Sequence, residues 1–226
     1  MVASSHDYQS QQIESEPVSD EAVALANAVA AAGRFSAAPS GTVFCQGKPH
    51  FRTQLARDLG CFLDVDPEVE GWECLPCAVP IAASGSGPSF HVPDFRVFKA
   101  DGGTSLLDAV PSMAAGSKLR YPQGDEVGAE RYRRVDEAEI RTEPKLSNAK
   151  ELLRYAGVEV LLGDRIRFLT MLDENGPTPL SECLRGCRGR TDPIAMIAVL
   201  TLRRFISMDI DEAPIGPETV IRRFSI

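Results

Sequence analysis

The sequence predicts a mixed α/β core followed by a smaller module of three helices and a β-ribbon. Two patterns predict the core: apolar residues at helical spacing over 50–62, and polar–apolar alternation over 91–99 and 104–110. The last third instead contains three successive helical patterns and then two short strand-like stretches. The expected parts are a tail with a short alanine-rich helix (1–36), the core (37–156) and the C-terminal module (157–226).

The N-terminal part is expected to contribute little to either unit. Residues 1–18 are rich in Ser, Gln, Glu and Asp and have too few apolar side chains to form a core. Ser19 and Asp20 can cap an alanine-rich helix over 21–32, which Gly33 ends. The acidic start is unlike a secretory signal, and no apolar run is long enough for a membrane span. We therefore expect a cytoplasmic protein with no membrane partner.

The core is expected to consist of a mixed sheet flanked by helices. An acidic turn around Pro67 separates the first helix from the strands, and the stretch "SGSGP" is typical of a loop between two strands. Strands that alternate with helices in this order favour a layered α/β unit. The expected elements are a helix at 50–62, strands at 71–83, 91–99, 104–110 and 131–135, and a helix at 147–155.

The C-terminal module has the element order of a winged helix-turn-helix. Asp192 can cap its third helix, with Pro193 at the first helical position. Two short stretches after that helix are expected to pair as strands. Three helices followed by a β-ribbon is the order found in winged DNA-binding modules. The expected elements are helices at 164–172, from 178 or 181 to 184, and at 193–205, and strands at 207–210 and 218–224.

Charge is distributed unevenly between the two units. Residues 1–140 contain 11 Lys and Arg against 20 Asp and Glu, whereas residues 141–226 contain 13 against 12. The overall charge of −8 disfavours a general nucleic-acid coat but leaves a DNA-facing surface possible in the module. An acidic wing, with Asp209, Asp211 and Glu212, favours docking of a protein instead. The arginines that flank the third helix, and that would contact DNA, are Arg185, Arg188, Arg190, Arg203 and Arg204.

Six cysteines in a chain without a secretory signal are expected to be thiols. The pairs Cys74/Cys77 and Cys183/Cys187 could together complete a zinc site. They lie more than a hundred residues apart, unlike the ligands of a zinc ribbon. Buried thiols are therefore the default interpretation.

Two carboxylates on neighbouring strands suggest a divalent metal ion. Asp94 lies in "VPDF", and Asp108 lies in the apolar strand "SLLDAV", beyond a turn that contains "DGG". An unpaired carboxylate is costly to bury, so Asp108 is expected to face a cleft. Oxygen ligands of this kind suit Mg²⁺ or Mn²⁺. For Asp94 alone, the alternative is an acid in a turn or at a sheet edge.

Five stretches in order resemble the TnsA-type transposon endonuclease family: "FRTQLARDLGCFLDVDPEVEGWECLP", "FHVPDFRVFKADGG", "SLLDAVP", "YRRVDEAEIRTEPKLSNAKELLRYA" and the C-terminal helical module. The resemblance implies a PD-(D/E)xK restriction-endonuclease-like core followed by a winged-helix-like module. It also implies Mg²⁺- or Mn²⁺-dependent cleavage of DNA, with Asp94 and Asp108 as metal ligands. A transposase and an AAA+ ATPase regulator would be its partners.

Two of the four chemical positions of this family pattern are apolar here. Ala56 stands where the family has a helical Glu, and Val110 stands where it has a Lys. Loss of one charge-stabilising donor typically costs ~10²–10³ in rate. The sequence thus predicts either a metal-dependent endonuclease or an inactive nuclease-fold protein that binds DNA or an assembly partner. The residues that could restore catalysis alongside Asp94 and Asp108 are Glu73, Lys99 and Lys118.

Overall fold

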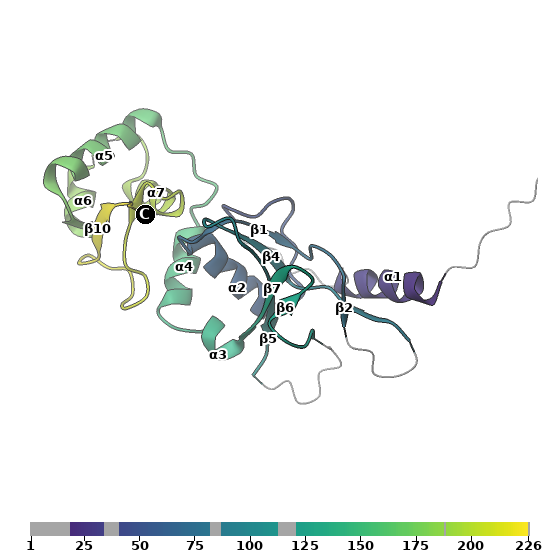
Figure 1. Ribbon diagram of the computed structural model, residues 1–226. Helices are drawn as coiled ribbons and strands as arrows, with labels where there is room; N and C mark the ends of the chain where they lie inside the picture. The colour runs from purple at the N-terminus through teal and green to yellow at the C-terminus, as the bar shows by residue number, and fades with distance from the viewer. Residues whose placement is uncertain (1–18, 34–40, 82–86, 113–120, 188, 226) are drawn as a thin grey trace, which may run out of the picture.

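The computed structural model describes residues 19–33, 41–81, 87–112, 121–187 and 189–225. It shows a mixed α/β protein with a mixed sheet flanked by helices (Figure 1). Within these ranges no helix is both long and apolar enough to cross a membrane. The helices are α1 (Asp20–Ala32), α2 (Gln54–Val65), α3 (Glu137–Ile140), α4 (Lys145–Leu153), α5 (Leu162–Asn175), α6 (Leu180–Gly186) and α7 (Pro193–Leu202).

The main sheet has the strand order β1-β4-β5-β7-β6. Neighbours pair antiparallel except for β5 and β7, which pair parallel. A separate two-stranded pair, β2 with β3, lies beside it. The strands of these two sheets are β1 (Val69–Cys74), β2 (Val79–Ile81), β3 (Ser89–His91), β4 (Phe95–Lys99), β5 (Thr104–Val110), β6 (Glu126–Val127) and β7 (Glu130–Asp136).

Helix α2 covers one face of the main sheet and forms most of the first core. Its N-cap, Thr53, accepts a hydrogen bond from the backbone N–H of Ala56 at 3.0 Å. Below the helix, Trp72 and Phe95 are fully buried and meet edge to face, with ring centroids 5.5 Å apart. Burial of these large aromatic side chains is the main stabilising contribution at this face. The strands beneath α2 are thereby fixed in place.

Two of the predicted strands are interrupted in the structure. The prediction of one strand over 71–83 is wrong, because Leu75 has φ 48° and ends β1, and β2 starts only at Val79. The strand predicted over 91–99 is likewise divided into β3 and β4. Pro93 lies in the gap, where a residue without a backbone N–H cannot continue a ladder. As a result Asp94 sits immediately before β4.

The C-terminal module combines α5, α6 and α7 with a three-stranded sheet of order β8-β10-β9. The predicted pairing of the two late strand-like stretches is confirmed over a shorter length, since Arg222 pairs with Ser207. A cluster that includes Leu153 of α4 and Leu202 of α7 joins the module to the core. The strands are β8 (Thr178–Pro179), β9 (Ile206–Ser207) and β10 (Val220–Arg223).

Candidate functional site

The structure places Asp94 and Asp108 side by side, as the sequence predicts. Phe95 pairs with Leu107 across β4 and β5, so the residues just outside that pair face one another. The backbone N–H of Ala109 donates to Asp94 Oδ2 at 2.9 Å, and the backbone N–H of Asp94 donates to Asp108 Oδ1 at 3.1 Å. The two residues are 5% and 0% exposed, respectively. The expectation that Asp108 faces a cleft is therefore wrong, because its side chain is fully buried.

A single arginine joins the two carboxylates. Arg52, which directly precedes the N-cap of α2, donates from Nε to Asp94 Oδ1 at 2.8 Å and from Nη2 to Asp108 Oδ1 at 3.0 Å. We call this arrangement the Arg52 bridge. Its guanidinium supplies positive charge to two acids that would otherwise repel each other in a buried setting.

Asp108 has further partners on its second oxygen. Oδ1 already accepts from Arg52 and from the backbone of Asp94, while His91 Nε2 lies 2.7 Å from Oδ2. The hydroxyl of Tyr132 also donates to Oδ2, at 2.7 Å. A carboxylate offers about four lone-pair sites, so these four contacts occupy all of them.

The surroundings of the pair disfavour additional negative charge. Burial raises the pKa of Asp94, and Asp108 raises it further, against the lowering effect of Arg52. Burial and the nearby Asp108 likewise raise the pKa of Tyr132, which remains a hydrogen-bond donor. His91 packs against Tyr121, with ring centroids 5.3 Å apart. The acidic pair is thus enclosed by donors and aromatic rings.

These residues do not fit a Mg²⁺ or Mn²⁺ ion while the Arg52 bridge is in place. A divalent ion needs carboxylate oxygens with free lone pairs, and those of Asp108 are taken. The guanidinium is also a cation, and it would repel a second one. In the part of the chain that the structure describes, no group of three or more His, Cys, Asp and Glu side chains could hold a metal ion.

The structure does not bring the three candidate helper residues to the acidic pair. Glu73 forms an ion pair with Arg96 at 2.8 Å, on strands β1 and β4. Lys99 lies at the opposite end of β4 from Asp94 and faces Glu68, 3.6 Å away. Lys118 lies outside the described residues. Neither Glu73 nor Lys99 therefore lies where it could assist catalysis beside Asp94 and Asp108.

The two positions that depart from the family pattern hold apolar side chains that are wholly or partly buried. Ala56 is fully buried and belongs to the cluster that packs α2 against the sheet. Val110 is half-buried at the end of β5. Neither supplies a charged or polar group to the site.

Sequence reasoning missed two residues of this site, Tyr132 and Arg52. Arg52 is the one that joins both carboxylates. Its pairing depends on the tertiary approach of the α2 start to strands 42 and 56 residues further along the chain. One signal was present: two carboxylates expected to be buried together require a cation, and "FRTQL" places an arginine just before a helix cap.

The arginines predicted to contact DNA have different surroundings. Arg185 and Arg203 are exposed, and Arg185 lies 4.0 Å from Glu182 on its own helix. Arg190 is exposed as well, in the turn before α7. Arg188 lies outside the described residues. Three of the five are therefore available on the surface of the module.

Arg204 instead connects the module to the core. Its guanidinium donates to the backbone carbonyls of Asp66, at 2.9 Å, and of Val69. It also lies over the ring of Phe44, 4.2 Å from the centroid. Arg204 has φ 57°, and this left-handed backbone directs the chain out of α7. These contacts give Arg204 an inward, structural position.

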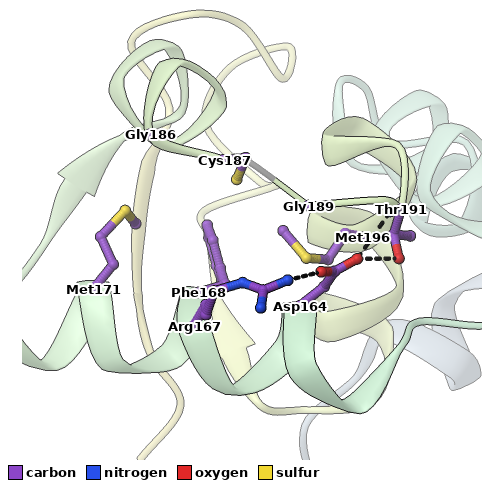
Figure 2. A pocket seen from close by; sticks show the side chains of 9 residues that line it. All are labelled: Asp164, Arg167, Phe168, Met171, Gly186, Cys187, Gly189, Thr191 and Met196. Atoms are coloured by element: carbon purple, nitrogen blue, oxygen red, sulfur yellow. Dashed lines mark hydrogen bonds and ion pairs between the residues drawn. The ribbon is translucent and has the colours of Figure 1, made fainter.

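Asp164 is another buried carboxylate, and it organises the turn between α6 and α7. Figure 2 shows its bonds to Arg167 and Thr191. Asp164 lines a cavity of about 270 Å³. Asp164 Oδ2 accepts from the backbone N–H groups of Arg190 and Thr191, at 3.0 and 2.9 Å, and from the Thr191 hydroxyl at 2.8 Å. These donors, Thr191 first, lower the pKa of Asp164. A Cβ on Gly189 would lie 2.6 Å from the Asp164 carboxyl carbon, so the turn needs glycine there.

The cysteine pairs of the sequence do not combine into a zinc site. Cys183 is buried in the core of the C-terminal module, whereas Cys74 packs beside the core under α2. Cys77 accepts a hydrogen bond from Arg96 Nη2 at 3.2 Å. All six cysteines are thiols, in agreement with the expectation from the sequence.

No protein-family model matches this chain, and no curated protein matches it either. The resemblance to TnsA-type endonucleases therefore depends on the ordered motifs alone.

Proposed function

We propose that this chain is a TnsA-like, nuclease-fold subunit of a transposon or mobile-element system that binds an assembly partner or DNA without cutting DNA. The observation that carries the proposal is the Arg52 bridge. It places a protein cation on the two carboxylates that a metal-dependent nuclease would use for its ion. The ordered family motifs support a role for this chain in the transposition of DNA.

Catalysis of phosphodiester cleavage needs charge stabilisation that this site lacks. A metal ion activates the water and neutralises developing charge, and a lysine assists it. Here the carboxylates are engaged, and the family's Glu and Lys positions hold Ala56 and Val110. Arg52 itself is tied to both acids and is therefore poorly placed to replace the lysine.

Several features support a restriction-endonuclease-like core and a winged-helix-like module. The core has α2 over a mixed sheet, with the acidic pair at the junction of β4 and β5. In the module, the order α5, β8, α6, α7, β9, β10 corresponds to that of winged helix-turn-helix units. We propose that the core and the module have these two folds and that they carry the surfaces that bind the partner or DNA.

Docking of a protein partner is favoured over DNA reading for the module. Its exposed arginines are accompanied by exposed acids on the segment after β9, at Asp209, Asp211 and Glu212. Phosphate binding disfavours such acids, whereas a protein surface of mixed charge tolerates them. An AAA+ ATPase regulator is the partner that the family resemblance implies.

A second candidate function is a metal-dependent endonuclease whose site opens when Arg52 leaves. The Arg52 side chain is 14% exposed, so it has a path to solvent, and Asp94 and Asp108 would remain adjacent. The ions would then be Mg²⁺ or Mn²⁺, held by the two aspartates.

A plasmid-nicking assay combined with a DNA-binding measurement tests the proposal. The full chain is incubated with supercoiled plasmid and Mg²⁺ or Mn²⁺, and binding of a labelled duplex is followed by fluorescence anisotropy at several salt concentrations. We expect the wild-type chain to nick the plasmid no more than the Asp94→Ala variant does, whether or not it binds the labelled duplex. Nicking that Asp94→Ala abolishes would instead establish the endonuclease.

A further inference from the structure

Cys45 and Cys74 are brought together by a contact that the sequence spacing does not show. Cys45 forms an isolated parallel β-bridge with Trp72, and Cys74 lies two residues further along β1. The bridge is fixed by backbone hydrogen bonds from Trp72 to Phe44, at 3.1 Å, and from Gln46 to Trp72, at 2.6 Å. Both cysteines are half-buried and pack against the same core cluster.

The two sulfurs have different hydrogen-bond partners: the Cys45 thiol faces the carbonyl of Gln46, at 3.9 Å, whereas Cys74 Sγ accepts from a backbone N–H. The proximity of the two thiols raises the pKa of Cys45 and lowers that of Cys74. The backbone N–H of His50 also donates to Cys74 Sγ, at 3.3 Å, and favours its thiolate. The thiolate is the nucleophilic form of cysteine, so Cys74 is the more reactive of the pair.

Cys77 lacks this arrangement although it is closer in sequence. Its sulfur accepts from Arg96 Nη2, and the residue packs with Val79 and Leu106, in a different cluster from Cys74. The left-handed backbone at Leu75 turns the chain between Cys74 and Cys77, and the two cysteines pack against different clusters. Cys77 therefore serves as an internal control for Cys74.

We propose that Cys45 and Cys74 form a thiol modification site, at which a peroxide oxidises the pair to a disulfide. The Cys74 thiolate attacks one peroxide oxygen, the O–O bond breaks, and hydroxide leaves; Cys74 becomes a sulfenic acid. The Cys45 sulfur then attacks the Cys74 sulfur, its proton passes to the departing hydroxide, and water is released. Two thiols and one hydrogen peroxide give one disulfide and two waters.

The bridge would act on the segment that carries Arg52. A disulfide usually spans about 4.4–6.8 Å between Cα atoms. Closing the disulfide fixes Cys45 within this distance of Cys74 on β1. It also uses the sulfur that accepts from the backbone N–H of His50, two residues before Arg52. Oxidation of the pair and the Arg52 bridge thus share one segment, 45–52.

Mass spectrometry of the peroxide-treated protein tests the assignment. The reduced, folded full chain is treated with a small excess of hydrogen peroxide, free thiols are alkylated, and the digest is analysed without reductant. We expect a Cys45–Cys74 cross-linked peptide that is two hydrogens lighter than its parts and that dithiothreitol separates. Cys77→Ser should retain this cross-link, and Cys45→Ser should lose it and yield a dimedone-reactive sulfenic acid at Cys74.

A Cys74–Cys77 cross-link, a Cys45→Ser protein without sulfenic acid at Cys74, or full alkylation of Cys45 and Cys74 after peroxide would overturn the proposal. None of these readouts involves DNA or a metal ion. A failure here is therefore distinct from a failure of the proposed binding function.

Discussion

Among the buried carboxylates of the molecule, the Asp94–Asp108 pair and Asp164 are satisfied in different ways. In the core, Asp94 and Asp108 depend on side chains from distant elements, chiefly Arg52. In the C-terminal module, Asp164 accepts backbone N–H groups from one turn, including that of Thr191. The pKa of Asp94 is raised by burial, and the pKa of Asp164 is lowered by its hydrogen bonds.

This difference separates a site that can change state from one that fixes a turn. Backbone donors are part of the fold, so they stabilise the ionised form of Asp164 wherever the turn is folded. The charge of the core pair is compensated mainly by one partly exposed side chain, Arg52. Removing that side chain would change the chemistry of the core pair. Asp164 also has an arginine partner, Arg167, but it would keep its backbone donors if that side chain were removed.

The largest expected effect comes from Arg52→Met. The substitution leaves two buried, adjacent carboxylates without their cation, and removal of one partner from a buried charge pair typically costs about 3–5 kcal/mol. Urea denaturation at pH 7 measures the free energy of unfolding. The matched control is Arg133→Met, whose exposed ion pair with Glu139 should contribute only about 0.2–1 kcal/mol. Equal effects of the two substitutions would remove the distinction between the core site and the surface.

Gly189→Ala should produce the next largest effect, confined to the module. The added Cβ would lie 2.6 Å from the carboxyl carbon of Asp164, which four donors hold in place. Overpacking of this kind typically costs about 1–3 kcal/mol. Thermal unfolding monitors the loss, and Gly157→Ala, where no atom lies within 4 Å of the new Cβ, is the control. A Gly189→Ala protein as stable as the Gly157→Ala protein would show that the turn adapts.

The two sites should respond to pH with opposite signs. Asp164 has a lowered pKa in the folded state, so its stabilisation is present above the ordinary value of 3.8 and is lost as pH falls through the folded pKa. Asp94 has a raised pKa, so wild type is most stable relative to Asp94→Asn below 3.8 and loses that advantage as pH rises through the folded pKa. Urea denaturation of wild type, Asp164→Asn and Asp94→Asn from pH 3 to pH 7 measures both trends. Parallel trends for the two variants would contradict the comparison.

The smallest effect is expected for Lys99→Met. Lys99 lies at the far end of β4 in an exposed pair with Glu68, so its loss should change the free energy of unfolding by no more than about 1 kcal/mol. It should also leave any Mn²⁺ binding by the Arg52→Met protein unchanged in a calorimetric titration. A clear loss of that binding would restore Lys99 as a contributor to the acidic site.

Local patterns predicted much of the fold. The alternation over 104–110 gave β5 with its observed bounds, and the Asp192 and Pro193 signal gave the start of α7. The adjacency of Asp94 and Asp108 followed from the two strands that hold them. These features depend on residues close together in the sequence.

Features that depend on tertiary contacts were not predicted. Leu75 adopts a left-handed backbone without being glycine, which its residue type does not predict. Pro76, directly after it, was the signal in the sequence that β1 could not continue. The partners of Arg52 and Arg204, and the approach of Cys45 to Cys74, arise only when distant segments pack. Arg204 is an example: the sequence predicted that it contacts DNA, whereas in the structure its guanidinium lies over the ring of Phe44.

The most direct test of the Arg52 bridge is a calorimetric titration of Mn²⁺ at pH 7 into wild type, Arg52→Met and the double variant Arg52→Met/Asp94→Ala. The bridge predicts no binding to wild type, binding to Arg52→Met, and loss of that binding in the double variant. Thermal unfolding with and without Mn²⁺ shows whether each variant is folded. Binding of Mn²⁺ to wild type that Asp94→Ala abolishes would contradict the account, because the carboxylates would then be free for a metal with Arg52 present.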